Sequence, residues 1–299
     1  MKQPVAVPLD HRGMLEVGGA DAQQFLQGIT SNDMTRVGAE TAVWTGFLTP
    51  QGKFQHEFFV ALSPDRESLW LDCEAGRREH LHKRLKVFKL RADVQLTPRP
   101  DLAVYALLGE RALGLLDLPA LEGYARPFAG GVVFVEPRLG ALGARAVLPA
   151  DRAAASLQEA GFAFGELADF DQQRISLGIP DGSRDLEPER ATLLENGFDE
   201  LHGISWDKGC FMGQELTARM KYRGLAKKRL VPVRIEGPTP EPGTSVRRGE
   251  KVAGTVRSAI DGIGLALLKL DQIDAGESAA PLHAGESTLT PRKPAWASF

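Results

Sequence analysis

Two kinds of apolar spacing alternate along the first two thirds of the chain, one helical and one strand-like. Apolar residues at helical spacing predict helices over 19–29, 77–90, 151–161 and 168–180. Short apolar runs predict two strands within 42–62 around a turn at Pro50–Lys53, and further strands over 101–109 and 130–136. Asp21 and Asp151 stand at expected helix N-caps, and Gly161 and Gly178 at expected helix ends.

The last third has a different pattern. Apolar strands over 229–237, 251–260 and 262–270, separated by loops rich in Gly and Pro, predict a small barrel or sandwich. Before them, 181–206 has little periodicity, and a loop of that length is usually functional or disordered. It carries seven acidic residues between Asp181 and Glu200.

The basic segment 219–229 follows at once, with Tyr222 inside it. Three interpretations are open for this segment. It can be a solvated linker, it can pair with the acidic stretch 181–200, or it can bind an anionic ligand or partner.

Composition narrows the class of protein. The chain has 299 residues, 43% hydrophobic and 25% charged, which predicts a globular protein of more than one compact unit. The net charge of −3 gives no global field that favours nucleic acid. We expect no membrane segment and a monomer. Only two cysteines predict a reducing compartment. The N-terminus shows neither an apolar signal region nor a transit peptide, so we expect the cytoplasm, although an organelle matrix would also fit the cysteine count.

Few residues carry obvious chemistry, because the common phosphate-loop, dinucleotide, metalloprotease and hydrolase motifs are missing. Cys73, at a strand end, is expected to pack, and His80 and His82 are expected at the surface. His56 and Glu57 are neighbours on a strand, so they should point to opposite faces, one buried and one exposed.

Cys210 is the other candidate, in DKGCFMGQELTAR (207–219) between Gly209 and Gly213. A helix beginning near Met212 would place the thiol at its positive end and favour the thiolate. One cysteine cannot complete a zinc or iron–sulfur site. Cys210 can therefore pack, act as a nucleophile or redox thiol, or ligate a site shared with another protein.

Several segments, taken together in order, resemble the YgfZ-type folate-binding proteins, which share a fold with the glycine cleavage T-protein. The most specific is KGCFMGQE (208–215). The others are GADAQQFLQGITSNDM (19–34), LTPQGKFQHEFFV (48–60), RISLGIPDGSRD (174–185), LLENGFDELHGISWDKGC (193–210), YRGLAKKRLVPV (222–233) and GTVRSAIDGIGLALLKL (254–270).

The resemblance implies an α+β fold: a three-lobed ring of two intertwined α+β lobes and a C-terminal β-barrel around a central folate channel. The lobes would span 1–225 and the barrel 226–290, with a loose tail at 291–299. The implied function is that of a tetrahydrofolate-binding accessory protein in iron–sulfur cluster assembly or repair. It would work with assembly proteins and cluster-dependent enzymes, including radical enzymes that thiolate transfer RNA.

Site residues also follow from the resemblance. Cys210 and Lys208 would carry the chemistry, with Cys210 as a ligand of a transient cluster shared with a partner. The expected folate-binding residues are Asn32, Glu57, Glu195, Trp206, Gln214, Glu215 and Arg223.

Two other functions are open. The chain can be a folate-dependent aminomethyltransferase, although His56 and Glu57 replace the aspartate pair of the T-protein and Leu177 replaces its pterin-binding glutamate. It can also be an RNA-binding module through its basic stretch, although direct nucleic-acid binding is not expected at this net charge. An accessory protein is favoured over an enzyme.

Overall fold

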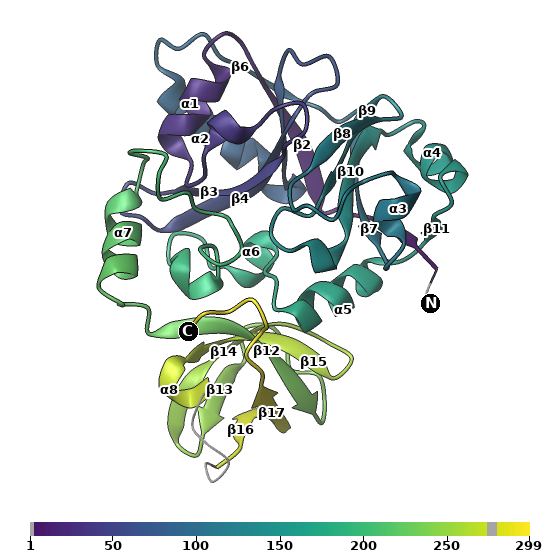
Figure 1. The fold of residues 1–299 in the computed structure, drawn as a ribbon. Coiled ribbons are helices and arrows are strands. Elements are labelled where there is room, and N and C mark those ends of the chain that lie inside the picture. Colours follow the sequence, from purple (N-terminus) through teal and green to yellow (C-terminus); the bar gives the residue numbers. More distant parts are fainter. Residues whose placement is uncertain (1–2, 274–279) are drawn as a thin grey trace. The chain divides into compact units, whose positions relative to one another are not determined.

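A computed structural model describes residues 3–273 and 280–299 and divides into two compact units (Figure 1). The first unit comprises Met1–Leu48, Gln55–Phe170 and His202–Met212. The second comprises Thr49–Phe54, Asp171–Leu201 and Gly213–Phe299. Both units are therefore assembled from segments that are distant in the sequence.

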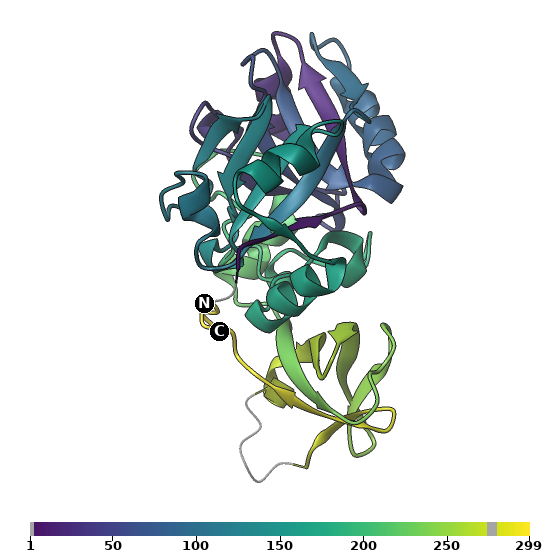
Figure 2. The ribbon, with the colours of Figure 1, turned by 90° about the vertical axis from the view of Figure 1, so that its right-hand side faces the viewer.

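The first unit contains a five-stranded antiparallel sheet that holds the predicted strand pair of 42–62. Its order is β3 (Val43–Leu48), β4 (Phe54–Leu62), β5 (Leu69–Glu74), β2 (Arg12–Gly18) and β6 (Gln95–Pro98). The predicted helices are present as α1 (Ala22–Ile29) and α2 (Arg78–Lys89), and short 3-10 turns lie at η1 (Met34–Arg36) and η2 (Ala75–Arg77). Leu81 and Leu85 of α2 are buried in the core of this sheet, as predicted, and Figure 2 shows the blue helix beside its strands.

A six-stranded sheet completes the first unit. Its order is β11 (Ala163–Phe164), β1 (Val5–Pro8), β7 (Leu102–Leu108), β10 (Ala144–Pro149), β9 (Gly131–Val135) and β8 (Ala125–Phe128). Its other helical elements are α3 (Ala112–Leu115), η3 (Gly140–Leu142) and α4 (Ala153–Glu159). Leu157 of α4 packs with Val133 and Leu148 in its apolar core.

The two predicted aspartate caps do not form. Asp21 precedes α1, but its carboxylate accepts a hydrogen bond from the Asp93 amide at 2.8 Å instead of from the helix. Helix α4 begins one residue later than expected, after Arg152, so Asp151 is not its cap. In both places, a tertiary contact or a shifted start replaces the local cap that sequence alone suggests.

The second unit is built on a closed six-stranded barrel, which decides between the predicted barrel and sandwich. Its order is β12 (Lys228–Glu236), β15 (Ile263–Lys269), β14 (Lys251–Ile260), β13 (Ser245–Arg248), β16 (Leu282–Ala284) and β17 (Ser287–Pro291). The barrel closes where β17 pairs with β12, and Val231, Val256 and Leu268 fill its interior. Its remaining helical elements are α5 (Leu167–Leu177, which begins in the first unit), α6 (Gly182–Asp185), η4 (Leu194–Asn196), α7 (Gln214–Tyr222) and α8 (Leu270–Ile273).

The aperiodic segment after α5 is ordered by buried ion pairs. Arg174 is fully buried, and its guanidinium lies 2.6 Å from Asp171 and 2.7 Å from Asp185. Asp185 also accepts a hydrogen bond from Ser258 of the barrel at 2.5 Å. These contacts fix α5 and α6 against strand β14, so much of the long predicted loop is structured.

The C-terminal segment, predicted as a loose tail, makes specific contacts. The Trp296 indole donates to the Leu177 carbonyl at 2.7 Å, and the Arg229 guanidinium lies 4.4 Å from the centre of the Phe299 ring. Across the two described stretches of chain, no helix has the length and apolar character needed to cross a bilayer.

Candidate functional site

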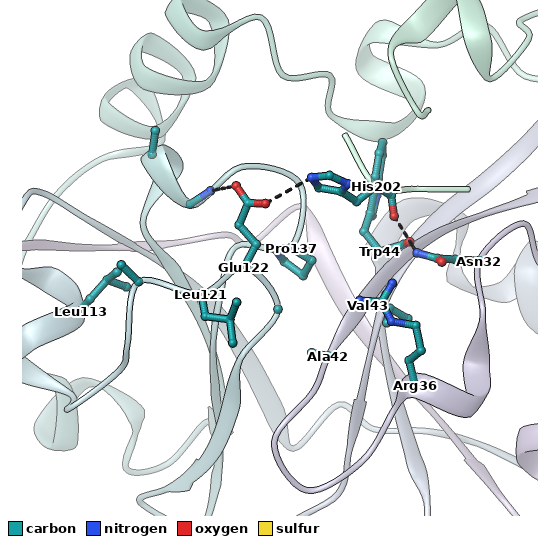
Figure 3. Close-up of a pocket in the computed structure, with 14 residues that line it drawn as sticks. Asn32, Arg36, Ala42, Val43, Trp44, Leu113, Leu121, Glu122, Pro137 and His202 are labelled. Carbon is teal, nitrogen blue, oxygen red and sulfur yellow. Dashed lines mark hydrogen bonds and ion pairs between the residues drawn. The ribbon is translucent and has the colours of Figure 1, made fainter. Parts of the chain in front are cut away.

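A cavity of about 410 Å³ opens within the first unit (Figure 3). That volume falls in the range of pockets that hold small organic ligands. Its lining comes from strand β3 of the five-stranded sheet, from loops and helical turns next to the six-stranded sheet, and from the 202–212 segment: Asn32, Arg36, Ala42, Val43, Trp44, Leu113, Ala120, Leu121, Glu122, Gly123, Pro137, Gly140, Ala141 and His202. The cavity thus combines an apolar wall with an exposed guanidinium, a carboxylate and an imidazole.

Asn32, which was predicted to bind a ligand, lines the cavity, and its amide group holds the cavity wall. Its Nδ2 donates to the carbonyls of Trp44 and His202, both at 2.7 Å, and its Oδ1 accepts from the Asp33 amide at 2.8 Å. The clamp holds His202 with a φ of 59°, a left-handed conformation that is uncommon outside glycine. Asn32 therefore positions other lining residues.

Glu122 and His202 contact each other in the lining of the cavity (Figure 3). One oxygen of Glu122 accepts from the Gly140 amide at 2.9 Å, and the other lies 3.2 Å from Nε2 of His202. Both side chains are partly exposed, at 36% for Glu122 and 59% for His202. They are the cavity groups best placed to exchange hydrogen bonds with a ligand.

Glu57 lies behind the cavity wall. Its carboxylate is 1% exposed and accepts hydrogen bonds from the Trp44 indole and from Arg12. Trp44 lines the cavity and Glu57 does not, so Glu57 acts on the cavity through the orientation of the indole.

The expectation that only one of His56 and Glu57 is buried is wrong, because both are 1% exposed. Their side chains meet different partners, as neighbours on a strand should. The His56 ring stacks on His80 with 5.0 Å between centroids, and Nε2 of His56 lies 2.7 Å from Nδ1 of His80. Burial, followed by the nearby charges of Arg77, His80 and Arg84, lowers the pKa of His56 to about 2.

Glu57 belongs to a network of six buried charges between the two sheets of the first unit. Arg12 pairs with Glu57 and Asp72, and Arg145 of β10 reaches Asp72 of β5 at 2.6 Å. Arg145 and Arg138 both pair with Glu136, at 3.0 and 2.7 Å. Burial alone would raise the pKa of Glu136, but these two guanidinium groups outweigh it and lower that pKa to about 2.

Hydrogen bonds hold the segment 202–212 against residues 27–32, which comprise the end of α1 and the three residues after it. Ser31 donates to the Gly203 carbonyl at 2.6 Å, and the Met212 amide donates to the Gly28 carbonyl at 3.2 Å. Between these points, Nζ of Lys208 donates to the carbonyls of Thr30 and Asn32, each at 2.6 Å. Burial lowers the pKa of Lys208 to about 8, with Asp33 opposing the shift. Lys208, predicted to carry chemistry, is positioned as an anchor.

Cys210 lies on this fastened segment and is exposed. Its neighbour Phe211 is buried, and Gly209 has a φ of 86°, which a residue with a side chain adopts only with strain. Helix α7 begins at Gln214, two residues after the expected start near Met212, and Cys210 precedes its N-cap Gly213 by three residues. Within residues 3–273 and 280–299, no group of three or more His, Cys, Asp or Glu is arranged to hold a metal ion.

The remaining predicted residues fall into two places. Trp206 is half-buried in the first unit. Glu195, Gln214, Glu215 and Arg223 belong to the second unit, where Glu195 accepts from the Thr192 hydroxyl at 3.0 Å. The structure thus brings together Asn32, Lys208 and, through Trp44, Glu57.

The sequence analysis did not predict the lining residues Arg36, Glu122 and His202. No motif marks them, because they come from a 3-10 turn, a loop before β8 and the 202–212 segment, and only tertiary folding makes them neighbours. His202 was the one most easily found from the sequence, since it lies inside 193–210, one of the segments that carry the family resemblance.

The fold has a counterpart among solved structures. The structure of the glycine cleavage system aminomethyltransferase T from Bartonella henselae matches with a TM-score of 0.79 at 14% identity, covering 99% of this chain and 86% of that chain. This match confirms the predicted α+β fold with a C-terminal barrel, and it shows the fold alone.

Sequence relatives then give the family. Residues 227–299 match the family model of the CAF17 C-terminal beta-barrel domain. The mitochondrial iron–sulfur cluster assembly factors IBA57 of Mus musculus and Homo sapiens are each 33% identical over 293 residues, covering 92% of this chain and 79% of theirs. The chain belongs to the family of IBA57 iron–sulfur cluster assembly factors.

The prediction of a cytoplasmic location is wrong by the same comparison, since both relatives are named as mitochondrial proteins. The cysteine count did not decide between the two compartments. Low cysteine usage separates reducing from oxidising compartments, but it does not separate the cytoplasm from the interior of an organelle.

Proposed function

We propose that this chain is an accessory factor of iron–sulfur cluster assembly and that Cys210 supplies one thiolate to a cluster shared with a partner protein. The observation that carries the proposal is an exposed thiol on a segment that Lys208 and Ser31 hold in place. Iron–sulfur clusters are held by several thiolates, and Cys73 is buried, so the other ligands would come from the partner.

The test replaces Cys210 with Ser in cells that lack the native protein, and measures the activity of cluster-dependent enzymes. We expect loss of activity with an unchanged melting temperature. Asp207→Asn is the matched control, because Asp207 is exposed on the same segment. Full rescue by a folded Cys210→Ser protein would remove the thiol from the function.

We further propose that the cavity of the first unit binds a tetrahydrofolate, and the lining residues fit such a molecule. The Trp44, Leu121 and Pro137 side chains offer an apolar wall for the pterin ring, and Glu122 can accept hydrogen bonds from the pterin edge. Arg36 is exposed and can pair with the carboxylates of the glutamate tail. A bound tetrahydrofolate would supply a reduced pterin able to carry one-carbon units.

Calorimetric titration with tetrahydrofolate tests this second part. Arg36→Glu and Glu122→Gln should each weaken binding about tenfold or more, the equivalent of about 1.4 kcal/mol. Arg152→Glu, a charge reversal at an exposed arginine outside the lining, should leave the affinity within twofold. Equal affinity in all four proteins, wild type included, would place the ligand elsewhere.

The proposed function also includes the client enzymes and the location of the protein. The supported enzymes would include cluster-dependent radical enzymes that thiolate transfer RNA, and the mitochondrial relatives favour work inside that organelle. Aminomethyl transfer is less favoured, because Glu57 is enclosed by Arg12 and Trp44 and does not line the cavity.

A further inference from the structure

The stretch from the last turn of α7 to the start of β12, in the second unit, combines exposed cations with exposed apolar side chains. Tyr222 is 76% exposed and Leu225 is 42% exposed. Four exposed cations surround them in the sequence: Arg219, Arg223, Lys227 and Lys228. Figure 1 shows this green segment as the connection that leads from the helix into the barrel.

Two basic residues of the segment 219–229 pair with the acidic stretch 181–200. Lys221 forms an ion pair with Asp199, and Arg229 forms one with Glu200 and donates to the Leu194 carbonyl at 2.5 Å. One of the three interpretations of the basic sequence is therefore confirmed at these two positions.

The same pairing does not account for the other cations. Among the residues that the structure describes, no acidic side chain forms an ion pair with Arg219, Arg223, Lys227 or Lys228. A solvated linker accounts for exposed charges, but Tyr222 and Leu225 place two exposed apolar side chains close together in the sequence, unlike the scattered single ones that are normal on a surface. Tyrosine and arginine are the residue types that contribute most to protein–protein binding, and cations around them steer an anionic partner.

The geometry points to a docking surface for an acidic protein that carries an iron–sulfur cluster. It consists of Arg219, Tyr222, Arg223, Leu225, Lys227 and Lys228. The cluster part of this inference rests on the proposed function, because a cluster held by thiolates adds negative charge to the protein that bears it. Held at both ends by ion pairs, the segment would bind with little loss of conformational entropy.

A protein is favoured over RNA as the partner. Leu225 offers no ring on which a base can stack and no donor for a phosphate, whereas it can fill an apolar pocket on a protein. The net charge of −3 also opposes a polyanion as long as RNA outside this one surface.

Photo-crosslinking in the full-length protein tests the surface. A benzoylphenylalanine is placed at position 222 in cells that depend on this chain, and the crosslinked species is identified by mass spectrometry. We expect an acidic protein with cluster ligands. Arg223→Glu with Lys227→Glu should lower the crosslink yield at least tenfold. The control pair, Arg234→Glu with Lys251→Glu on exposed barrel positions, should change it less than twofold.

Each other outcome overturns the inference. A ribonuclease-sensitive product would assign the surface to RNA, and the absence of a product, or a yield that charge reversal leaves unchanged, would remove the docking role. The Cys210→Ser protein separates the two proposals. If it supports full enzyme activity while the charge-dependent crosslink persists, the thiol role fails and the surface stands.

Discussion

At the scale of single residues, Cys73 and Cys210 have opposite environments. Cys73 is 1% exposed and its thiol donates to the Gly13 carbonyl at 3.3 Å. Burial raises the pKa of Cys73 to about 12, whereas Cys210 is exposed to solvent. Because alkylation requires the thiolate, only Cys210 should react in the folded protein.

Iodoacetamide labelling followed by intact-mass measurement checks this difference. One adduct should form at pH 7.5, and Cys210→Ser should abolish it, while a second adduct should form only in denaturant. Cys73→Ser is the complementary variant and should keep the single adduct. Two adducts on the folded wild type would contradict the buried position of Cys73.

His56 gives a pH dependence whose sign follows from its pKa. The folded pKa of about 2 lies below the unfolded value of 6.5, so the unfolded state binds the proton first on acidification. Stability from neutral His56 is therefore present above pH 6.5 and is lost as the pH falls below it. The loss should reach at most about 1.4 kcal/mol per pH unit.

Urea unfolding at pH 7, 6 and 5 measures that slope in wild type and in His56→Gln. The free energy of unfolding should fall less steeply with acidification in the variant. His283→Gln, at an exposed histidine of the barrel, should keep the wild-type slope. Parallel profiles for all three proteins would show that folding does not lower the pKa of His56.

Single residues were also the level at which sequence-based prediction was least complete. The packing of Cys73 follows from its strand, and it was predicted. The burial of His56 beside Glu57 was not, because a strand covered on both faces hides polar and apolar neighbours alike. Which charge finds a buried partner depends on strands distant in sequence.

At the scale of elements, the segment 202–212 depends on contacts to residues 27–32. Lys208 donates to two carbonyls there, so Lys208→Met should loosen the whole segment. Hydrogen bonds of charged groups contribute about 1.5–3 kcal/mol each, so local opening should increase about tenfold or more. The amides of Ser205 and Met212 report this opening directly, because both donate across the contact.

Hydrogen exchange followed by mass spectrometry measures this effect on peptides spanning 203–212. Lys83→Met is the control, since Lys83 forms an exposed ion pair with Glu79 on α2. Faster exchange confined to the Lys208 variant is expected. If both variants exchange like wild type, the lysine does not anchor the segment.

Elements were predicted well wherever their periodicity was strong. Helix α2 and the strands β3, β4, β14 and β15 lie within a few residues of their expected bounds. The start of α7 was misplaced because Gly213, with a φ of 80°, delays the helix beyond CFM. The contact of 202–212 with 27–32 joins residues about 180 apart, and no local pattern reports such a contact.

At the scale of the whole molecule, the α+β fold and the barrel could be predicted from the sequence. The buried ion pairs that join the two sheets of the first unit could not. Three arginines and three carboxylates are buried between the two sheets of the first unit: Arg12, Arg138, Arg145, Glu57, Asp72 and Glu136. Charged residues are normally read as surface positions, so the core was underestimated where these six lie.

The stability of the first unit should depend on this network of six buried charges. Removing one member leaves an unbalanced buried charge, so Arg145→Met should cost about 3–5 kcal/mol of unfolding free energy. Arg99→Met is the matched control in the same unit, since Arg99 pairs with Glu16 and Asp101 in partial contact with solvent, and it should cost about 1 kcal/mol or less. Adding Glu136→Gln to Arg145→Met restores charge balance, so the double variant should lose less than the sum of the two single changes. Urea unfolding of the four variants measures these energies, and equal costs for Arg145→Met and Arg99→Met would mean that the sheets are joined by apolar packing alone.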